Sequence, residues 1–239
     1  MHRFANPTRF MKVADRLFPF VSAGFLALLA WGLYGALLAS PEDYQQGSTV
    51  RIMYIHVPSA YLAVMIYGVL AACSASVLIW KHPLADLIAR ASAPVGLVFT
   101  VLCLATGSLW GKPMWGTWWD WDARMTSVLI LFFLYLGYIA LLNAFDDPAR
   151  GSKPAAILAL VGVVNLPVIK FSVDWWNTLH QPASLLRFDG PAMPASMLQP
   201  LLVMMAAFTF FYLMVLVIRL RAEFAAARIR TLRITGASE

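Results

Sequence analysis

The sequence predicts an all-α, polytopic membrane protein with six transmembrane helices. Of its 239 residues 61% are hydrophobic and only 13% are charged, a composition typical of a chain that lies in lipid. Six apolar stretches are each long enough to cross a hydrocarbon core of roughly 30 Å, which takes about 20 helical residues. These stretches are residues 18–39, 58–80, 92–110, 125–143, 154–170 and 198–218. We expect residues 1–239 to form a single integral-membrane domain.

The first three stretches have recognisable ends. The first has an apolar run of about 20 residues, longer than a typical cleavable signal core, and no clean small-x-small site follows it, so we expect it to stay as a helix. The second begins at Pro58, which suits a first helical turn, and His56 lies just before it. The third ends at Trp110, after which Lys112 and Pro113 are expected to shape the turn.

The later stretches are less uniform. The fourth is continuous, whereas the fifth is short, contains Asn165 and Pro167, and ends at Lys170, so its boundaries are the least defined by the pattern. Cys73 and Cys103 fall inside predicted helices and form no CxxC motif, which indicates small buried residues rather than a disulfide or a metal site.

The distribution of Lys and Arg orients the helices. Six spans place both termini on one side, and that side with its two loops carries thirteen Lys and Arg residues. Because cytoplasmic loops are enriched in positive charge, we expect both termini inside. The same rule accounts for the net charge of +6, so charge gives no indication of nucleic-acid binding. The outer side carries five cations: Arg51, Lys112, Arg124, Lys170 and Arg187.

An unusual cluster of tryptophans lies in the expected outer loop 110–126, which reads WGKPMWGTWWDWDARMT. It holds five of the nine tryptophans of the chain, and Trp175 and Trp176 fall on the same side. An aromatic belt would distribute tryptophans over both membrane interfaces. The cluster therefore predicts a platform for a large, flat, apolar partner.

Two histidines flank this loop in matching contexts. His56-Val-Pro-Ser and His180-Gln-Pro-Ala-Ser both place a proline two residues after the histidine. If residues 174–180 are helical, Trp176 and His180 share a face at i, i+4 spacing, and Pro182 ends that helix. A single histidine at a membrane interface usually makes a structural hydrogen bond, but two such residues beside an aromatic platform favour a pair of ligands.

A porphyrin suits these residues better than a zinc ion. Zinc takes four ligands, or three and a water, and the outer loops offer no cysteine. Haem iron accepts an imidazole on each face, and its macrocycle can stack on aromatic rings. Its propionates favour cations, arginine above all. The residues thus predict a bis-histidine haem site without saying what the haem is for; the candidate propionate partners are Arg51, Lys112, Arg124 and Arg187.

The loop itself contains a possible capping box. Thr117 and Asp120 have the required spacing, which predicts a short outer amphipathic helix from Trp118, with Trp118 and Trp121 on one side. Asp120 is expected to have only this local role. Asp122 and Arg124 can either pair at the surface or take part in the site, and the sequence leaves both open.

The segment Trp115-Gly116-Thr-Trp118-Trp119-Asp-Trp121-Asp122-Ala-Arg124 resembles the WWD signature of haem-handling proteins. With six spans and one outer histidine on each side of the motif, the whole chain is similar to the haem exporter protein C (CcmC) family of bacterial cytochrome c maturation. Larger relatives have more spans and more histidines. Met125 departs from the usual leucine. The resemblance implies that haem b is held by His56 and His180 as axial ligands, by a platform of Trp115, Gly116, Trp118, Trp119 and Trp121, and by Asp122, Arg124 and Arg51.

The resemblance also implies partners and a location. Members of the family work in the bacterial inner membrane, bind haem at the periplasmic face and deliver it to the haem chaperone CcmE. They do so beside the ABC-type subunits CcmA and CcmB and the small protein CcmD. This chain has no Walker A sequence, so any use of ATP would belong to a partner.

Three other functions are weighed against haem delivery. A membrane b-type cytochrome that passes electrons is the main alternative, although its histidines commonly lie within the membrane. A pathway for an ion or solute usually shows ionisable residues at mid-membrane, and the span centres here have none. An enzyme is not expected, because no nucleophile–base pair or paired carboxylate stands out on the outer face.

Overall fold

The structure is a computed structural model that describes residues 6–145, 147–181 and 190–236. Over these residues it contains no β-strand, and six helical segments have the length and composition to cross a membrane. The predicted fold class and number of spans are therefore confirmed. In chain order the elements are α1 (Pro7–Tyr34), the π-helical η1 (Gly35–Ala39), the 3₁₀ helix η2 (Ser48–Ile52), α2 (Met53–Trp80), α3 (Pro83–Trp115), α4 (Ala123–Asn143), α5 (Pro148–Gly162), α6 (Asn165–Trp175) and α7 (Ala195–Gly236).

Several helices extend beyond the predicted spans. The chain is helical from Ser48 into α2, so His56 and Pro58 lie inside the helical segment and not before or at its start. Helix α3 continues to Trp115 and ends at Gly116, whose φ of 76° suits a glycine after a helix. Lys112 and Pro113 therefore belong to its last turn. The apolar stretch of a span reflects the thickness of the bilayer. The helix itself can be longer, because its backbone hydrogen bonds continue beyond the apolar residues.

The fifth span consists of two helices. Helix α5 ends at Gly162 and α6 starts at Asn165, with a turn between them. Pro167 has no N–H to donate to the carbonyl four residues earlier, which weakens the helix at this point. The Asn165 side chain donates from Nδ2 to the Ser127 carbonyl at 2.8 Å and so ties the break to α4.

The two outer segments that the sequence predicts as helical are not helical in the structure. Residues 117–122 form an irregular connection, because the Thr117 hydroxyl bonds within the local turn to the N–H and carbonyl of Trp119. Asp122, not Thr117, caps a helix there. Helix α6 ends at Trp175 and residues 176–180 are non-helical, so Trp176 and His180 do not share a helix face. Pro182 lies outside the described residues.

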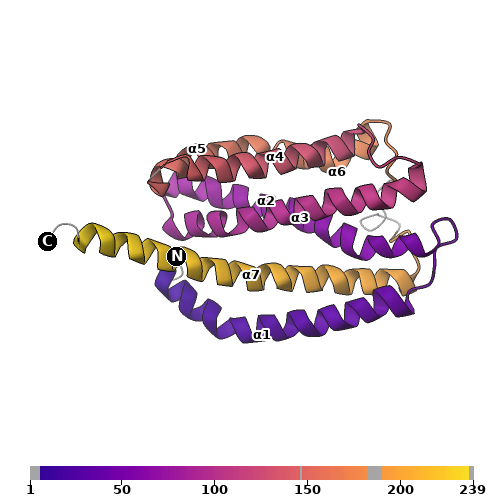
Figure 1. The fold of residues 1–239 in the computed structure, drawn as a ribbon, viewed down its shortest axis with the longest axis horizontal. Helices are drawn as coiled ribbons and strands as arrows, with labels where there is room; N and C mark the ends of the chain where they lie inside the picture. The colour runs from indigo at the N-terminus through magenta and orange to yellow at the C-terminus, as the bar shows by residue number, and fades with distance from the viewer. Residues whose placement is uncertain (1–5, 146, 182–189, 237–239) are drawn as a thin grey trace.

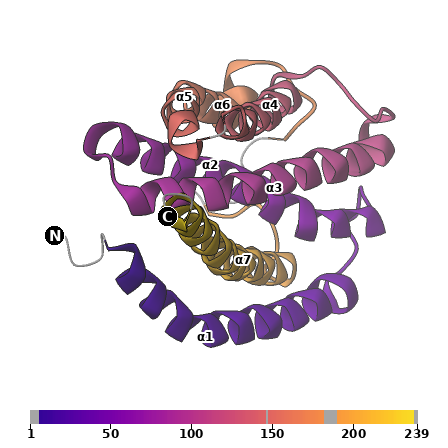
Figure 2. The same cartoon turned by 60° about the vertical axis from the view of Figure 1, so that its left-hand side comes forward.

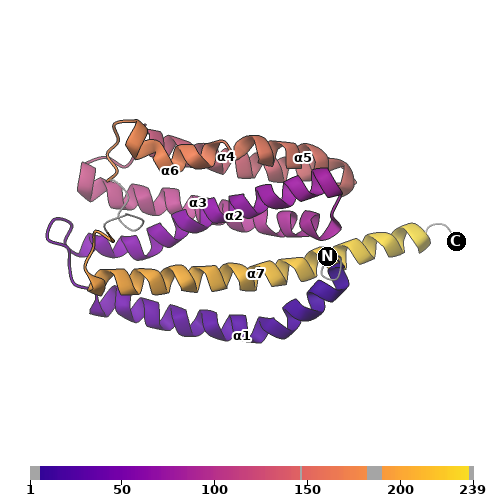
Figure 3. The same ribbon diagram turned by 180° about the vertical axis from the view of Figure 1, so that it is seen from behind.

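The helices pack in layers (Figures 1 and 3). Helix α1 contacts chiefly α7; α2 and α3 pack against each other in the middle; α4, α5 and α6 cover the other side. Figure 2 shows α1 set apart from α4, α5 and α6. The start of α1 and the end of α7 lie at one end of the bundle, and the α1–α2 and α3–α4 connections, with the described residues between α6 and α7, lie at the opposite end. We call the latter the loop end.

The core of the bundle depends on a close approach at Gly96 of α3. A Cβ at this position would collide with the hydroxyl of the fully buried Tyr135, which donates to the Ala63 carbonyl at 2.8 Å. We expect Gly96→Ala to lower the free energy of unfolding by about 1–3 kcal/mol, as overpacking does. The change would appear as a lower Tm in detergent. Gly68→Ala is the control, because nothing lies within 4 Å of its added Cβ. Equal Tm values for both variants would contradict the prediction.

Candidate functional site

His56 is held against α3 in one tautomer. Its Nδ1 lies 3.0 Å from Thr106 Oγ1, and the Thr106 hydroxyl donates to the Leu102 carbonyl at 2.6 Å. Because the hydroxyl proton is already used, Thr106 acts as the acceptor and His56 Nδ1 carries the proton. The lone pair of the neutral imidazole is then on Nε2, the nitrogen that remains available to a metal.

The last turns of α3 also fix the plane of the His56 ring. The ring meets Trp110 edge to face, with centroids 5.7 Å apart and planes at 74°. On the neighbouring side, a Cβ at Gly107 would lie 3.0 Å from His56 Cε1, so the ring packs directly on the helix backbone. Three residues within one and a half turns of α3 therefore set the position of this histidine.

His180 reaches the same end of the bundle from the α6–α7 connection. Its Nδ1 lies 2.7 Å from Asp122 Oδ2, and its ring meets Trp115 with centroids 4.9 Å apart. Its backbone N–H donates to Thr178 Oγ1 at 2.9 Å. A neutral His180 donates from Nδ1 to the carboxylate, which again leaves the Nε2 lone pair available. A carboxylate behind a histidine in this way is a common support for metal ligands.

Asp122 has two roles, and neither is surface pairing. Its Oδ1 accepts the N–H of Met125 at 2.7 Å and so caps α4, while Oδ2 bonds His180. The side chain is 3% exposed. Because both carboxylate oxygens are engaged, the start of α4 and the position of His180 are fixed by the same group. Surface pairing, one of the two alternatives for Asp122, is therefore not what the structure shows.

The protonation of His180 is set mainly by burial. Burial lowers its pKa below 6.5, and the hydrogen bond and charge of Asp122 oppose this effect without cancelling it. At pH 7 the imidazole is therefore neutral. Since the unfolded chain binds the proton more tightly, His180 favours the folded state above pH 6.5, and this contribution is lost as the pH falls below that value.

We expect His180 of the ligand-free protein to titrate with a midpoint below 6.5. The imidazole signals in an NMR titration of ¹⁵N-histidine-labelled protein would measure it, and His180→Gln would assign them. A midpoint above 6.5 would mean that Asp122 outweighs burial.

The α3–α4 connection presents two tryptophans to the outside. Trp118 is 53% and Trp121 73% exposed, while Trp119 is half-buried and meets Trp121 edge to face at 5.4 Å. The Ser108 hydroxyl donates to the Trp118 carbonyl at 2.6 Å, and Lys112 Nζ donates to the Gly116 carbonyl at 2.9 Å. An irregular segment is thus anchored to α3 while large apolar rings face outward.

The cations predicted to meet the haem propionates differ in the partners that they already have. Arg124 donates from Nε to Ser172 Oγ at 3.2 Å and from Nη2 to the Lys170 carbonyl at 3.5 Å. The Nε of Arg51 is buried and has no hydrogen-bond partner within the described ranges. A buried guanidinium nitrogen without a partner suits an anionic ligand. Lys112 lies 5.8 Å from the centroid of the Trp118 ring, and Arg187 lies outside the described residues.

The structure brings together most of the predicted residues and adds others. Thr106, Ser108 and Trp110 support the histidines or the loop from α3, and Ser172 contacts Arg124. The only sequence signal for Thr106 and Ser108 was their polarity near the end of an apolar span. Trp175 stacks on Phe171 at 5.5 Å within α6 and also meets Trp176 at 5.7 Å.

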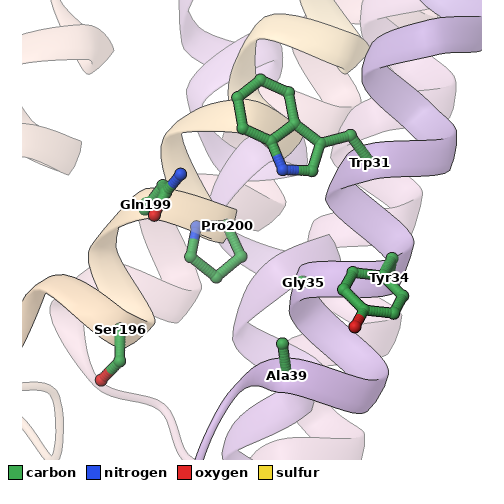
Figure 4. A pocket seen from close by; sticks show the side chains of 7 residues that line it. All are labelled: Trp31, Tyr34, Gly35, Ala39, Ser196, Gln199 and Pro200. Carbon is green, nitrogen blue, oxygen red and sulfur yellow. The ribbon is translucent and has the colours of Figure 1, made fainter.

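Two pockets lie away from the histidines. One of about 240 Å³ opens between the end of α1 and the start of α7 and is lined by Trp31, Tyr34, Gly35, Ala39, Ser196, Gln199 and Pro200 (Figure 4). The other, also about 240 Å³, is apolar and lies between α1, α3 and α7. Neither is lined by His56 or His180.

Comparisons with known proteins point to one family. The model of the family described as "Heme exporter protein C" matches residues 1–235. A protein of that name from Bradyrhizobium diazoefficiens is 55% identical over 98% of this chain and 89% of its own length. Those from Haemophilus influenzae and Escherichia coli K12 are 45% and 46% identical, over 93% and 81% of this chain and 91% and 79% of their own lengths.

Proposed function

The chain belongs to the haem exporter protein C family, and from this premise we propose that it binds one haem at the loop end and delivers it for cytochrome c maturation. His56 and His180 are the axial ligands of the haem iron in this proposal. The family is one of export, so we assign the chain a carrier's role and no catalysed reaction.

The observation that carries the proposal is the state of the two imidazoles. Each has its Nδ1 engaged, His56 with Thr106 and His180 with Asp122, and each therefore offers Nε2. Haem iron accepts an imidazole on each face. Two histidines with purely structural roles would have no reason to leave the same nitrogen, Nε2, available in both.

The surrounding residues suit the rest of the haem. Trp118 and Trp121 offer exposed apolar rings to the macrocycle, with Trp115, Gly116 and Trp119 supporting them. Arg51, whose Nε lacks a partner among the described residues, is the cation best prepared for a propionate. Arg124 is already bonded to α6, so its role is to hold the start of α4 against α6. We propose haem b, which needs no covalent attachment here.

The setting follows from the same family premise. We propose that residues 1–239 form one domain of the bacterial inner membrane, with both termini in the cytoplasm and the loop end in the periplasm. The acceptor is the chaperone CcmE, and CcmA, CcmB and CcmD are the membrane partners. The excess of Lys and Arg on the terminal side supports this orientation.

Titration of the ligand-free protein with haemin in mild detergent tests the proposal. We expect a Soret band that saturates at one haem per chain, with the low-spin spectrum of two imidazole ligands, followed by loss of haem to added apo-CcmE. Saturation without transfer to CcmE would favour the b-type cytochrome alternative. No saturable binding, with the protein folded, would overturn the proposal.

A further inference from the structure

The α1–α2 connection reaches into the candidate site through one side chain. Gln46 Oε1 accepts the indole N–H of Trp110 at 2.9 Å, a bond between residues 64 positions apart in the chain. The indole nitrogen can only donate, which fixes the amide orientation of Gln46. Trp110 in turn is the ring that meets His56 edge to face. Gln46, Trp110 and His56 therefore form a continuous chain of contacts.

The backbone of Gln46 is held in place by hydrogen bonds at both its N–H and its carbonyl. Its N–H donates to Asp43 Oδ1 at 2.9 Å, and its carbonyl accepts the Thr49 hydroxyl at 2.6 Å. The Gly47 N–H donates to the Asp43 carbonyl at 2.8 Å, and Gly47 has a φ of 54° that favours glycine. The turn of residues 43–47 thus presents the Gln46 amide from a defined position.

Trp110 also packs against apolar residues near the start of α2. Apart from His56, it packs at the edge of a cluster that contains Val50, Met53 and Tyr54, next to the start of α2. Apolar contacts have no preferred direction, so by themselves they do not fix where the indole nitrogen points. The hydrogen bond to Gln46 supplies the direction, since it fixes the indole nitrogen relative to the α1–α2 connection.

We propose that Gln46 is a positioning residue for His56 and acts through the Trp110 ring. The inference deepens the proposed function, on which it rests. Thr106 fixes which nitrogen of His56 is protonated. Gln46 fixes the Trp110 indole, and this indole limits the tilt of the His56 imidazole. Loss of the acceptor lets Trp110 rotate, and the His56 ring then samples orientations in which Nε2 does not point at the iron.

The first test uses the ligand-free protein and detects the hydrogen bond between Trp110 and Gln46 directly. In ¹⁵N-tryptophan-labelled protein, Trp110→Phe identifies the indole signal of Trp110. Gln46→Leu should shift that signal toward the value of an indole without an acceptor, and Gln46→Glu, which keeps an acceptor at the same length, should restore it. Gln45→Leu is the control, because Gln45 is the exposed neighbour. An unshifted Trp110 signal in Gln46→Leu would overturn the proposal.

The second test measures haem affinity and the coordination of the haem iron. We expect Gln46→Leu to weaken haem binding about tenfold, the lower end of the range for residues behind a metal ligand, and to broaden the low-spin signal in electron paramagnetic resonance. Gln46→Glu should bind as the wild type does. Trp110→Phe, which keeps an aromatic ring but loses the indole N–H donor, should resemble Gln46→Leu, and the double variant should be no weaker than either one.

The outcomes separate this inference from the proposed function. If the wild type binds one low-spin haem and Gln46→Leu has the same affinity and spectrum, the positioning role is wrong and the haem site stands. If the wild type shows no saturable haem binding, the proposed function itself fails. Additive losses in the double variant would show that Gln46 and Trp110 act separately, which would also overturn the inference.

Discussion

Replacement of His56 or His180 by alanine is expected to convert a six-coordinate, low-spin haem into a five-coordinate species with a shifted Soret band. Under the proposed assignment each variant loses one iron ligand, so the loss of affinity should exceed the roughly 10–100-fold that follows from removing a residue behind a ligand. Haemin titration and electron paramagnetic resonance of both variants measure the change. In the corresponding variants His56→Gly and His180→Gly, which leave more room at the ligand position, added imidazole should restore the low-spin spectrum.

The two alanine variants should differ in the stability of the ligand-free protein. His180→Ala leaves Asp122 Oδ2 buried without its donor, at a cost of about 1–3 kcal/mol or more for an unpaired buried charge. His56→Ala leaves the Thr106 hydroxyl still bonded to the Leu102 carbonyl. We therefore expect the lower Tm for His180→Ala. A low-spin haem of unchanged affinity in either variant would contradict the ligand assignment.

Asp122→Asn is expected to remove haem ligation by His180 while it preserves the helix. Asparagine is as good an N-cap as aspartate, so its Oδ1 can keep the Met125 N–H that starts α4. The amide group then faces His180 Nδ1. Because two donors cannot pair, the imidazole must take its proton on Nε2, the nitrogen that would bind iron. We expect haem affinity to fall about 10–100-fold with little change in Tm.

Two further variants complete the comparison. Asp122→Ala loses the cap as well as the histidine partner, so its Tm should fall further, by the equivalent of about 0.5–2 kcal/mol. Asp120→Asn makes the same chemical change two residues earlier and should bind haem as the wild type does. ¹⁵N spectra of the His180 ring report the tautomer directly. An Nδ1-protonated ring in Asp122→Asn, with wild-type affinity, would show that Asp122 does not set the tautomer.

Much of the architecture could be predicted because a membrane imposes a simple pattern on the chain. Six apolar stretches gave the number and order of the spans, and the tryptophans and histidines at their ends gave a candidate site that stays a prediction. The helix ends were misplaced, since hydropathy follows the thickness of the bilayer whereas α3 continues to Gly116 by hydrogen bonding. The capping box at Thr117 was wrong because its hydroxyl bonds within its own turn.

The amino-acid sequence by itself determined the fold class and the number of spans, because these depend on local composition, and it singled out two histidines as candidate ligands. Only the tertiary structure decided how these two histidines are held. His56 depends on Thr106, 50 residues away, His180 on Asp122 across 58 residues, and Trp110 on Gln46 across 64. No local periodicity encodes such pairs, since they form only when helices distant in the chain pack side by side.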